Sequence, residues 1–152
     1  METKIKKLKI LLLNGPNLNL LGTREIKIYG TTKFDKLIYN LKKKAKKFNT
    51  ILLDYQSNAE HKLIKKIHQS KILKIKYILF NPGAFAHTSI ALRDALLAIN
   101  IPFLEIHITN IFAREEFRAH SWISDISSGV ITGLGTDGYF WALKTAIKRL
   151  QK

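Results

Sequence analysis

The sequence of 152 residues contains no cysteine, one methionine and three prolines. Without thiols the chain cannot form disulfides, bind zinc or an iron–sulfur cluster through cysteine, or use a cysteine nucleophile. It also lacks any uninterrupted run of about 18 apolar residues, the length that spans a bilayer. The apolar residues 10–13 are too few for a signal peptide. We therefore expect a fold held by packing alone, no membrane partner, and a cytoplasmic location.

Acidic residues are scarce as well, with 11 against 26 lysines and arginines, which gives a net charge of +15. Such an excess is typical of proteins that bind nucleic acid or membrane surfaces. Only five of the 26 are arginines, however, and the lysines gather at helical spacing in 42–47 and 62–66. We interpret them as solvated helix faces that attract anions over long range, and we expect no nucleic-acid partner.

The remaining composition is ordinary, with 46% hydrophobic and 24% charged residues. These values and the length predict a single packed domain over residues 1–152. Short apolar segments alternate with longer segments of helical period. Strands are predicted at 8–13, 50–55, 77–80, 102–108 and 129–134. One helix is predicted from a cap at Thr31 or Thr32 to residue 48, and a second begins after a cap at Asn58. Further helices are predicted at 88–99 and 137–150, with a short one at 114–118. This order predicts a three-layer, doubly wound α/β fold with a five-stranded parallel sheet.

In such sheets, ligands bind beyond the carboxyl ends of the strands. Here those ends are unusually polar, which favours a small polar ligand. The side chains concerned are Asn14, Asn17, Gln56, Ser57, Asn58, Asn81, Glu105, His107, Thr109 and Asn110.

The connection 15–30 after the first strand is longer than the usual two to six residues, which is typical of a lid. It lacks the Lys-Ser/Thr pair of a phosphate-binding loop but contains Arg24 and Tyr29. A phenol acts as a base only when ionised, which costs about 4 kcal/mol at neutral pH. A guanidinium about 4 Å away supplies roughly that much at an effective dielectric near 20. Arg114 and Arg118, which are expected to share a helix face, add positive charge. The alternative is that Tyr29 covers the core with its hydroxyl in water.

His107 is the candidate acid, because Glu105 lies two residues earlier on the same strand and faces the same side. His61 and His68 are expected to be structural or surface residues, and His87 to bond a ligand hydroxyl. No histidine pair has the helical spacing of zinc proteases, so no metal is expected.

The residues 133–138, GLGTDG, match the GxGxxG pattern of dinucleotide-binding turns. Only 14 residues follow, which leaves no second strand to carry the acidic residue that binds the ribose. We therefore interpret the motif as a tight turn with close helix packing.

Taken together, the polar blocks resemble the type II 3-dehydroquinate dehydratases over residues 11–143. The blocks are NGPNLNLLG at 14–22 with Arg24, Glu25, Tyr29 and Gly30, QSN at 56–58, NPGA at 81–84, HTSIALRDA at 87–95, EIHITN at 105–110, AREEFR at 113–118, and His120-Ser121. The resemblance implies a flavodoxin-like fold and a dodecamer built as a tetramer of trimers. It also implies a hydro-lyase that needs no cofactor and removes water from 3-dehydroquinate by anti-elimination through an enolate. The product, 3-dehydroshikimate, belongs to the shikimate pathway of aromatic amino acid biosynthesis.

The resemblance also implies roles for individual residues. Tyr29 would remove the C2 proton with help from Arg24, which also stabilises the transition state. Asn17 would hold a water near the enolate oxygen, Arg114 would lie near the base, and His107, oriented by Glu105, would protonate the leaving hydroxyl. The substrate-binding residues would be Asn81, His87, Ile108, Thr109 and Arg118, with Asp94 reaching a neighbouring subunit. Ile26 stands where the family usually has proline, which predicts a looser lid.

The sequence leaves two alternatives open. One is a non-catalytic anion or nucleotide binder on the same scaffold, since a fold does not fix a function. The weaker one, suggested by charge alone, is a nucleic-acid-binding protein.

Overall fold

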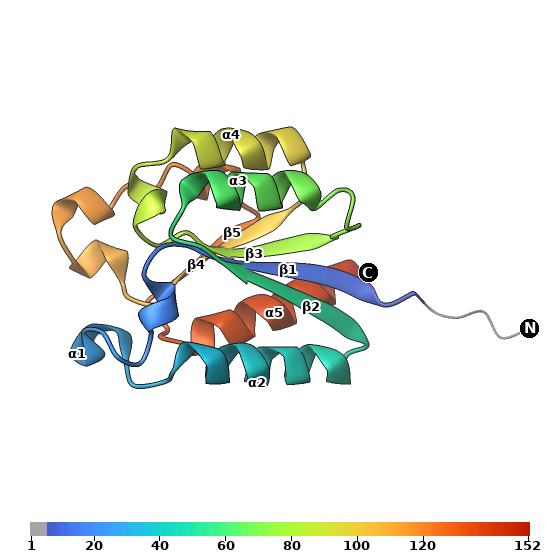
Figure 1. The fold of residues 1–152 in the computed structure, drawn as a ribbon, viewed down its shortest axis with the longest axis horizontal. Helices are drawn as coiled ribbons and strands as arrows, with labels where there is room; N and C mark the ends of the chain where they lie inside the picture. The colour runs from blue at the N-terminus through green and yellow to red at the C-terminus, as the bar shows by residue number, and fades with distance from the viewer. Residues whose placement is uncertain (1–5) are drawn as a thin grey trace, which may run out of the picture.

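Five parallel strands form one sheet in the computed structural model, which describes residues 6–152 (Figure 1). The strands are β1 (Leu8–Asn14), β2 (Thr50–Gln56), β3 (Tyr77–Asn81), β4 (Phe103–His107) and β5 (Gly129–Thr132). Their order in the sheet is β2-β1-β3-β4-β5, the flavodoxin-like order. The predicted doubly wound fold is confirmed. Residues 1–5 of the predicted domain lie outside the described part of the chain.

Helices cover both faces of the sheet. On one face lie α2 (Phe34–Lys47) and α5 (Asp137–Leu150), and on the other lie α3 (Glu60–Gln69) and α4 (Ile90–Ile99) (Figure 1). Alternate residues of β1 enter the two cores, with Ile10 and Leu12 towards α2 and α5, and Leu11 and Leu13 towards α3 and α4. All four are fully buried, which explains why this strand is a continuous apolar run.

Two predicted helix caps are wrong. The residue before α2 is Lys33 and the residue before α3 is Ala59, and neither makes a side-chain capping bond. Asn58 is used elsewhere, because its Oδ1 accepts hydrogen bonds from the backbone N–H of Asn17 (3.0 Å) and from Nε2 of Gln56 (3.2 Å). These bonds tie the connection after β1 to the end of β2.

The long connection after β1 contains two short helical turns, η1 (Leu18–Leu20) and α1 (Ile26–Tyr29). Tyr29 therefore ends a helical turn rather than lying in irregular backbone. Gly22 and Gly30, which flank Arg24 and Tyr29, have φ values of 89° and 86°, which glycine adopts without strain.

Arg114 and Arg118 do not share a helix face, contrary to the prediction. Arg114 follows the turn η3 (Ile111–Ala113) in extended backbone, with φ −110° and ψ −158°. Arg118 ends a separate turn, η4 (Glu116–Arg118). The local spacing suggested one helix, but extended backbone at Arg114 and Glu115 separates the two turns.

The glycine motif at 133–138 forms a tight turn before α5, as predicted. Gly133 has a φ of 86°, and a Cβ on Gly138 would lie 3.1 Å from Cγ2 of Ile131. Glycine at 138 therefore lets α5 start close against the sheet.

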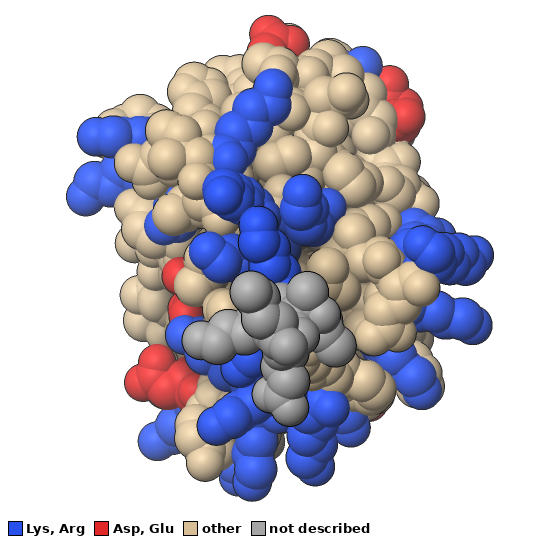
Figure 2. Space-filling model, turned by 90° about the vertical axis from the view of Figure 1, so that its right-hand side faces the viewer, with Lys and Arg blue, Asp and Glu red and all other residues tan. Residues whose placement is uncertain are grey.

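Lysines and arginines gather on the face at the amino ends of the strands (Figure 2). Several lie in the last turns of helices, where cations stabilise the helix dipole: Lys44, Lys46, Lys47, Lys66 and Lys148. Within residues 6–152, no helix has the length and apolar character needed to cross a membrane.

Candidate active site

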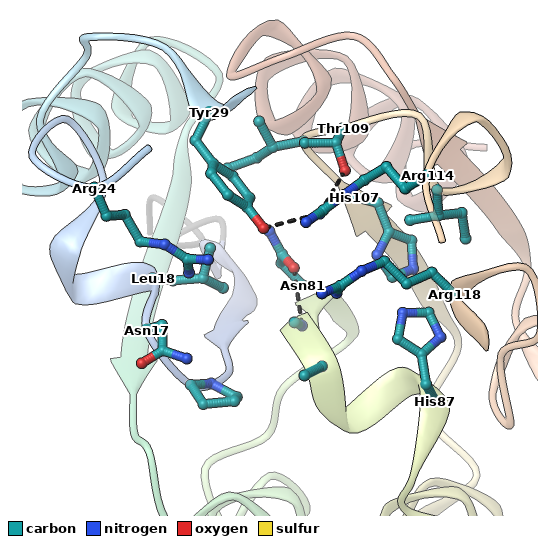
Figure 3. Close-up of a pocket in the computed structure, with 15 residues that line it drawn as sticks. Asn17, Leu18, Arg24, Tyr29, Asn81, His87, His107, Thr109, Arg114 and Arg118 are labelled. Carbon is teal, nitrogen blue, oxygen red and sulfur yellow. Dashed lines mark hydrogen bonds between the residues drawn. The ribbon is translucent and has the colours of Figure 1, made fainter. Parts of the chain in front are cut away.

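A pocket opens at the carboxyl ends of β1, β3 and β4 (Figure 3). The strand order reverses between β1 and β3, so the pocket lies where doubly wound folds bind ligands. Ten predicted site residues line it: Asn17, Arg24, Tyr29, Asn81, His87, His107, Ile108, Thr109, Arg114 and Arg118. The folding of the chain thus brings together side chains that are up to 101 positions apart in the sequence.

Two arginines surround the hydroxyl-bearing ring of Tyr29. Nη1 of Arg114 donates a hydrogen bond to the Tyr29 hydroxyl at 2.9 Å, and the guanidinium carbon of Arg24 lies 4.2 Å from the ring centroid. Both guanidinium groups therefore place positive charge beside the Tyr29 ring and hydroxyl, where it stabilises negative charge that develops on the oxygen.

Both arginines have further partners. Nη1 of Arg114 also donates to Oγ1 of Thr109 at 3.2 Å, which fixes the guanidinium between the end of β4 and α1. Arg24 donates to Glu25 at 3.0 Å. Its position is set less firmly, because the Glu25 side chain is about half exposed.

His107 and Glu105 form a buried pair on β4. Nε2 of His107 bonds to one oxygen of Glu105, and the hydroxyl of Ser124 donates to the other at 2.5 Å. Burial alone would raise the pKa of Glu105, but the bonds from His107, Ser124 and Ser121 outweigh it and hold the pKa below its usual value. The carboxylate is therefore charged at neutral pH and can orient the imidazole, which leaves Nδ1 of His107 for a ligand.

His87 lies beside this pair, its ring stacked on that of His107 with centroids 6.2 Å apart. Its Nδ1 donates to the backbone carbonyl of His120 at 2.8 Å. Burial lowers the pKa of His87, the nearby His107 and Arg118 lower it further, and the His120 carbonyl only partly offsets this. A neutral His87 thus keeps Nε2 as an acceptor for a ligand hydroxyl.

Two predicted site residues do not line the pocket. Glu105 lies behind His107, and Asp94 is exposed on α4. His61 and His68 are exposed on α3, as expected for surface residues. Among residues 6–152, no cluster of three histidine or acidic side chains could hold a metal ion.

Part of the pocket wall and the hydrogen bond that supports Glu105 were not predicted from the sequence. The missed wall residues are Pro16, Leu18, Gly83, Ala84 and Ile111. Pro16 and Gly83 stood within the motifs and were available as signals. No sequence signal pointed to Ser124, since it reaches Glu105 from a separate turn, η5 (Ser124–Ile126), 19 residues away.

The Glu105 pair predicts a pH-dependent contribution to stability. Because the folded pKa of Glu105 lies below the unfolded value of about 4.3, its contribution is complete above that pH and is lost as the pH falls through the folded value. Glu105→Gln removes this titration. We expect the free energy of unfolding, measured by urea denaturation, to fall more between pH 6 and pH 3.5 for the wild type than for Glu105→Gln. An equal fall would contradict the assignment.

One small pocket thus holds a candidate base between two cations, an imidazole oriented by a carboxylate, and further polar groups. This set defines an enzyme that carries out acid–base chemistry on a small anionic substrate. The family described as dehydroquinase class II matches residues 8–147, so the chain belongs to the class II dehydroquinase family.

Known relatives are similar to this protein over nearly the whole chain. The 3-dehydroquinate dehydratase of Buchnera aphidicola subsp. Schizaphis graminum is 63% identical over 144 residues, which are 95% of this chain and 97% of the relative. That of Erwinia tasmaniensis is 60% identical over 144 residues, 95% of each chain. The crystal structure of the type II dehydroquinase from Butyrivibrio crossotus superposes with a TM-score of 0.90 at 40% identity, covering 92% of this chain and 97% of that one.

Proposed function

We propose that this pocket removes water from 3-dehydroquinate to give 3-dehydroshikimate, with each residue in the role that its family motif assigns. The chain is a type II 3-dehydroquinate dehydratase, a hydro-lyase of the shikimate pathway. Tyr29 takes the proton from carbon 2, beside the ketone at carbon 3, and the electron pair moves onto the ketone oxygen as an enolate. When the ketone re-forms, the double bond joins carbons 1 and 2, and the hydroxyl on carbon 1 leaves with a proton from His107.

The observation that carries this proposal is the environment of the Tyr29 hydroxyl. Arg114 bonds to it at 2.9 Å and Arg24 lies 4.2 Å from its ring, in the same pocket as the His107 that Glu105 orients. These groups supply the two proton transfers that elimination beside a ketone requires. Arg24 also stabilises the charge that develops in the transition state.

The remaining pocket residues bind and orient the substrate in this proposal. The backbone amides of Ile108 and Thr109, with the Thr109 hydroxyl, hold the carboxylate. Asn17 holds a water near the enolate oxygen. Asn81, His87 and Arg118 bond the carboxylate or the ring hydroxyls. No cofactor takes part.

The catalytic unit is one domain over residues 1–152, and we propose that it assembles as a dodecamer of four trimers in the cytoplasm. Asp94, exposed on α4 and away from its own chain's pocket, is the residue assigned to a neighbouring subunit's site. Sedimentation or native mass measurement tests the assembly, and a monomer at working salt concentration would contradict it.

Mixing the protein with 3-dehydroquinate tests the function directly, because the product is a conjugated enone with a new ultraviolet absorbance. We expect the same rate with and without a chelator. An absence of turnover would contradict the function, and turnover that the chelator abolishes would contradict cofactor-free chemistry. Membership of the class II family does not favour the alternative of a non-catalytic binder.

Capture of the anionic substrate is expected to depend only moderately on salt. The lysine-rich face of Figure 2 lies at the other end of a seven-residue strand, roughly 23 Å from the pocket, beyond the Debye length of about 10 Å at 0.1 M salt. The pocket arginines therefore provide most of the attraction. We expect kcat/KM to fall about two- to threefold between 100 and 400 mM salt, a range in which the distant lysines are screened. A fall of a hundredfold would show that the distant lysines dominate.

A further inference from the structure

Three polar side chains meet beneath the pocket, inside the core. Asn14 ends β1 and Asn81 ends β3, and the two residues are register partners on adjacent parallel strands. Each follows the alternation that places Leu12 and Leu79 in the core beneath α2 and α5. Tyr139, in the first turn of α5, places its hydroxyl between them.

The directions of the hydrogen bonds follow from the chemistry of the groups. The Tyr139 hydroxyl lies 2.6 Å from Oδ1 of Asn14, which can only accept, so the hydroxyl donates to it. The same hydroxyl then accepts from Nδ2 of Asn81 at 2.7 Å. On the other side of that amide, the backbone N–H of Gly83 donates to Oδ1 of Asn81 at 3.1 Å. Both ends of the Asn81 amide are thereby fixed, and one N–H of Nδ2 is left for the pocket that Asn81 lines.

These three hydrogen-bonded polar side chains lie in the core, at positions where apolar side chains would pack without needing hydrogen-bond partners. Tyr139 and Asn14 are fully buried, and Asn81 is 3% exposed. Within residues 6–152, Nδ2 of Asn14 has no hydrogen-bond partner, an arrangement that lowers stability. Burial also raises the pKa of Tyr139, so its hydroxyl keeps its proton and always donates to Asn14. The acceptor oxygen of Asn14 therefore sets the direction of the Tyr139 proton.

We propose that Tyr139 is a positioning residue for the dehydration: it holds the Asn81 amide so that an N–H, and never the carbonyl, faces the substrate. Asn14 sets this direction by accepting the Tyr139 proton. The pocket thus presents a fixed donor at Asn81, which selects a carboxylate or hydroxyl oxygen of the substrate. The proposal rests on the proposed function for the identity of the substrate.

Tyr139→Phe keeps the buried ring and removes only the hydroxyl. Because the Asn81 donor is no longer held in place while the base and the acid are untouched, we expect KM to rise about tenfold and kcat to change less than twofold. Tyr77→Phe is the matched control, since Tyr77 is 3% exposed and its hydroxyl accepts one bond, from Arg149 at 3.0 Å, outside the pocket lining. The control should leave both constants unchanged. An unchanged KM in Tyr139→Phe would overturn the proposal.

A double-mutant cycle separates positioning from general loss of structure. If Tyr139 acts through Asn81, Tyr139→Phe should raise KM in the wild type and have no further effect in an Asn81→Ala background. Effects on KM that multiply in the double variant would overturn the proposal, because they would show that the hydroxyl acts independently of Asn81.

A further variant and a readout without substrate complete the test. If Tyr139→Phe does not fold, Asn14→Ala tests the proposal instead, since it removes the acceptor of the Tyr139 proton and keeps the tyrosine ring. KM should rise severalfold in this variant, and an unchanged KM would overturn the proposal. In the free protein, the side-chain amide protons of Asn81 should exchange with water faster in the variant than in the wild type by NMR. This readout still tests the positioning if the wild type fails to turn over 3-dehydroquinate, which would refute the proposed function alone.

Discussion

Replacing Tyr29 with phenylalanine is expected to lower kcat for 3-dehydroquinate by about 10²- to 10⁴-fold, the usual contribution of a general base. The variant keeps the ring under Arg24 and loses only the hydroxyl that Arg114 contacts. Binding of 3-dehydroshikimate, measured by calorimetry, should stay nearly intact because the substrate-binding groups are unchanged. The loss therefore belongs to the chemical step rather than to binding.

Tyr39→Phe is the matched control, because Tyr39 is 64% exposed on α2 and its hydroxyl lies outside the pocket lining. It should keep the wild-type kcat. If Tyr29→Phe retained more than a tenth of the wild-type rate, Tyr29 would not be the base.

Replacing His107 with asparagine should produce a loss of similar size, about 10²- to 10⁴-fold in kcat, with some loss of binding. Asparagine removes the proton donor for the leaving hydroxyl, while the Ser124 hydroxyl still donates to the buried Glu105. The variant should therefore fold, because it does not leave an unpaired carboxylate in the core.

His68→Asn is the control for this second variant, since His68 is exposed on α3. A near-normal rate in His107→Asn would assign the acid to another group. The effects of His107→Asn and Tyr29→Phe should also fail to add in the double variant, because either change alone stops the same reaction.

Local, periodic signals in the sequence predict most of the fold. The apolar runs and helical spacings placed all five strands of the sheet and its four long helices, because each element must bury one face or two. The motif positions also located most of the pocket wall, since parallel strands end at one edge.

Other details depend on contacts between distant residues, which local patterns do not show. Asn58 has the residue type of a helix cap, yet it bonds to Asn17, 41 positions away. Tyr139 and Asn14 are 125 positions apart, and nothing in the sequence around either residue indicates their bond. Such pairings are set by the register of the sheet and by the position at which α5 packs on it, and periodicity alone determines neither.

The central claim is that Tyr29 removes the carbon-bound proton and His107 acts afterwards on the leaving hydroxyl. The most direct test is to incubate each variant with 3-dehydroquinate in D₂O and to follow deuterium at carbon 2 by NMR, against a sample without protein. His107→Asn should exchange the carbon 2 proton without forming product, because its base is intact. Tyr29→Phe should exchange no faster than the sample without protein. Equal enzymatic exchange in the two variants would contradict the account.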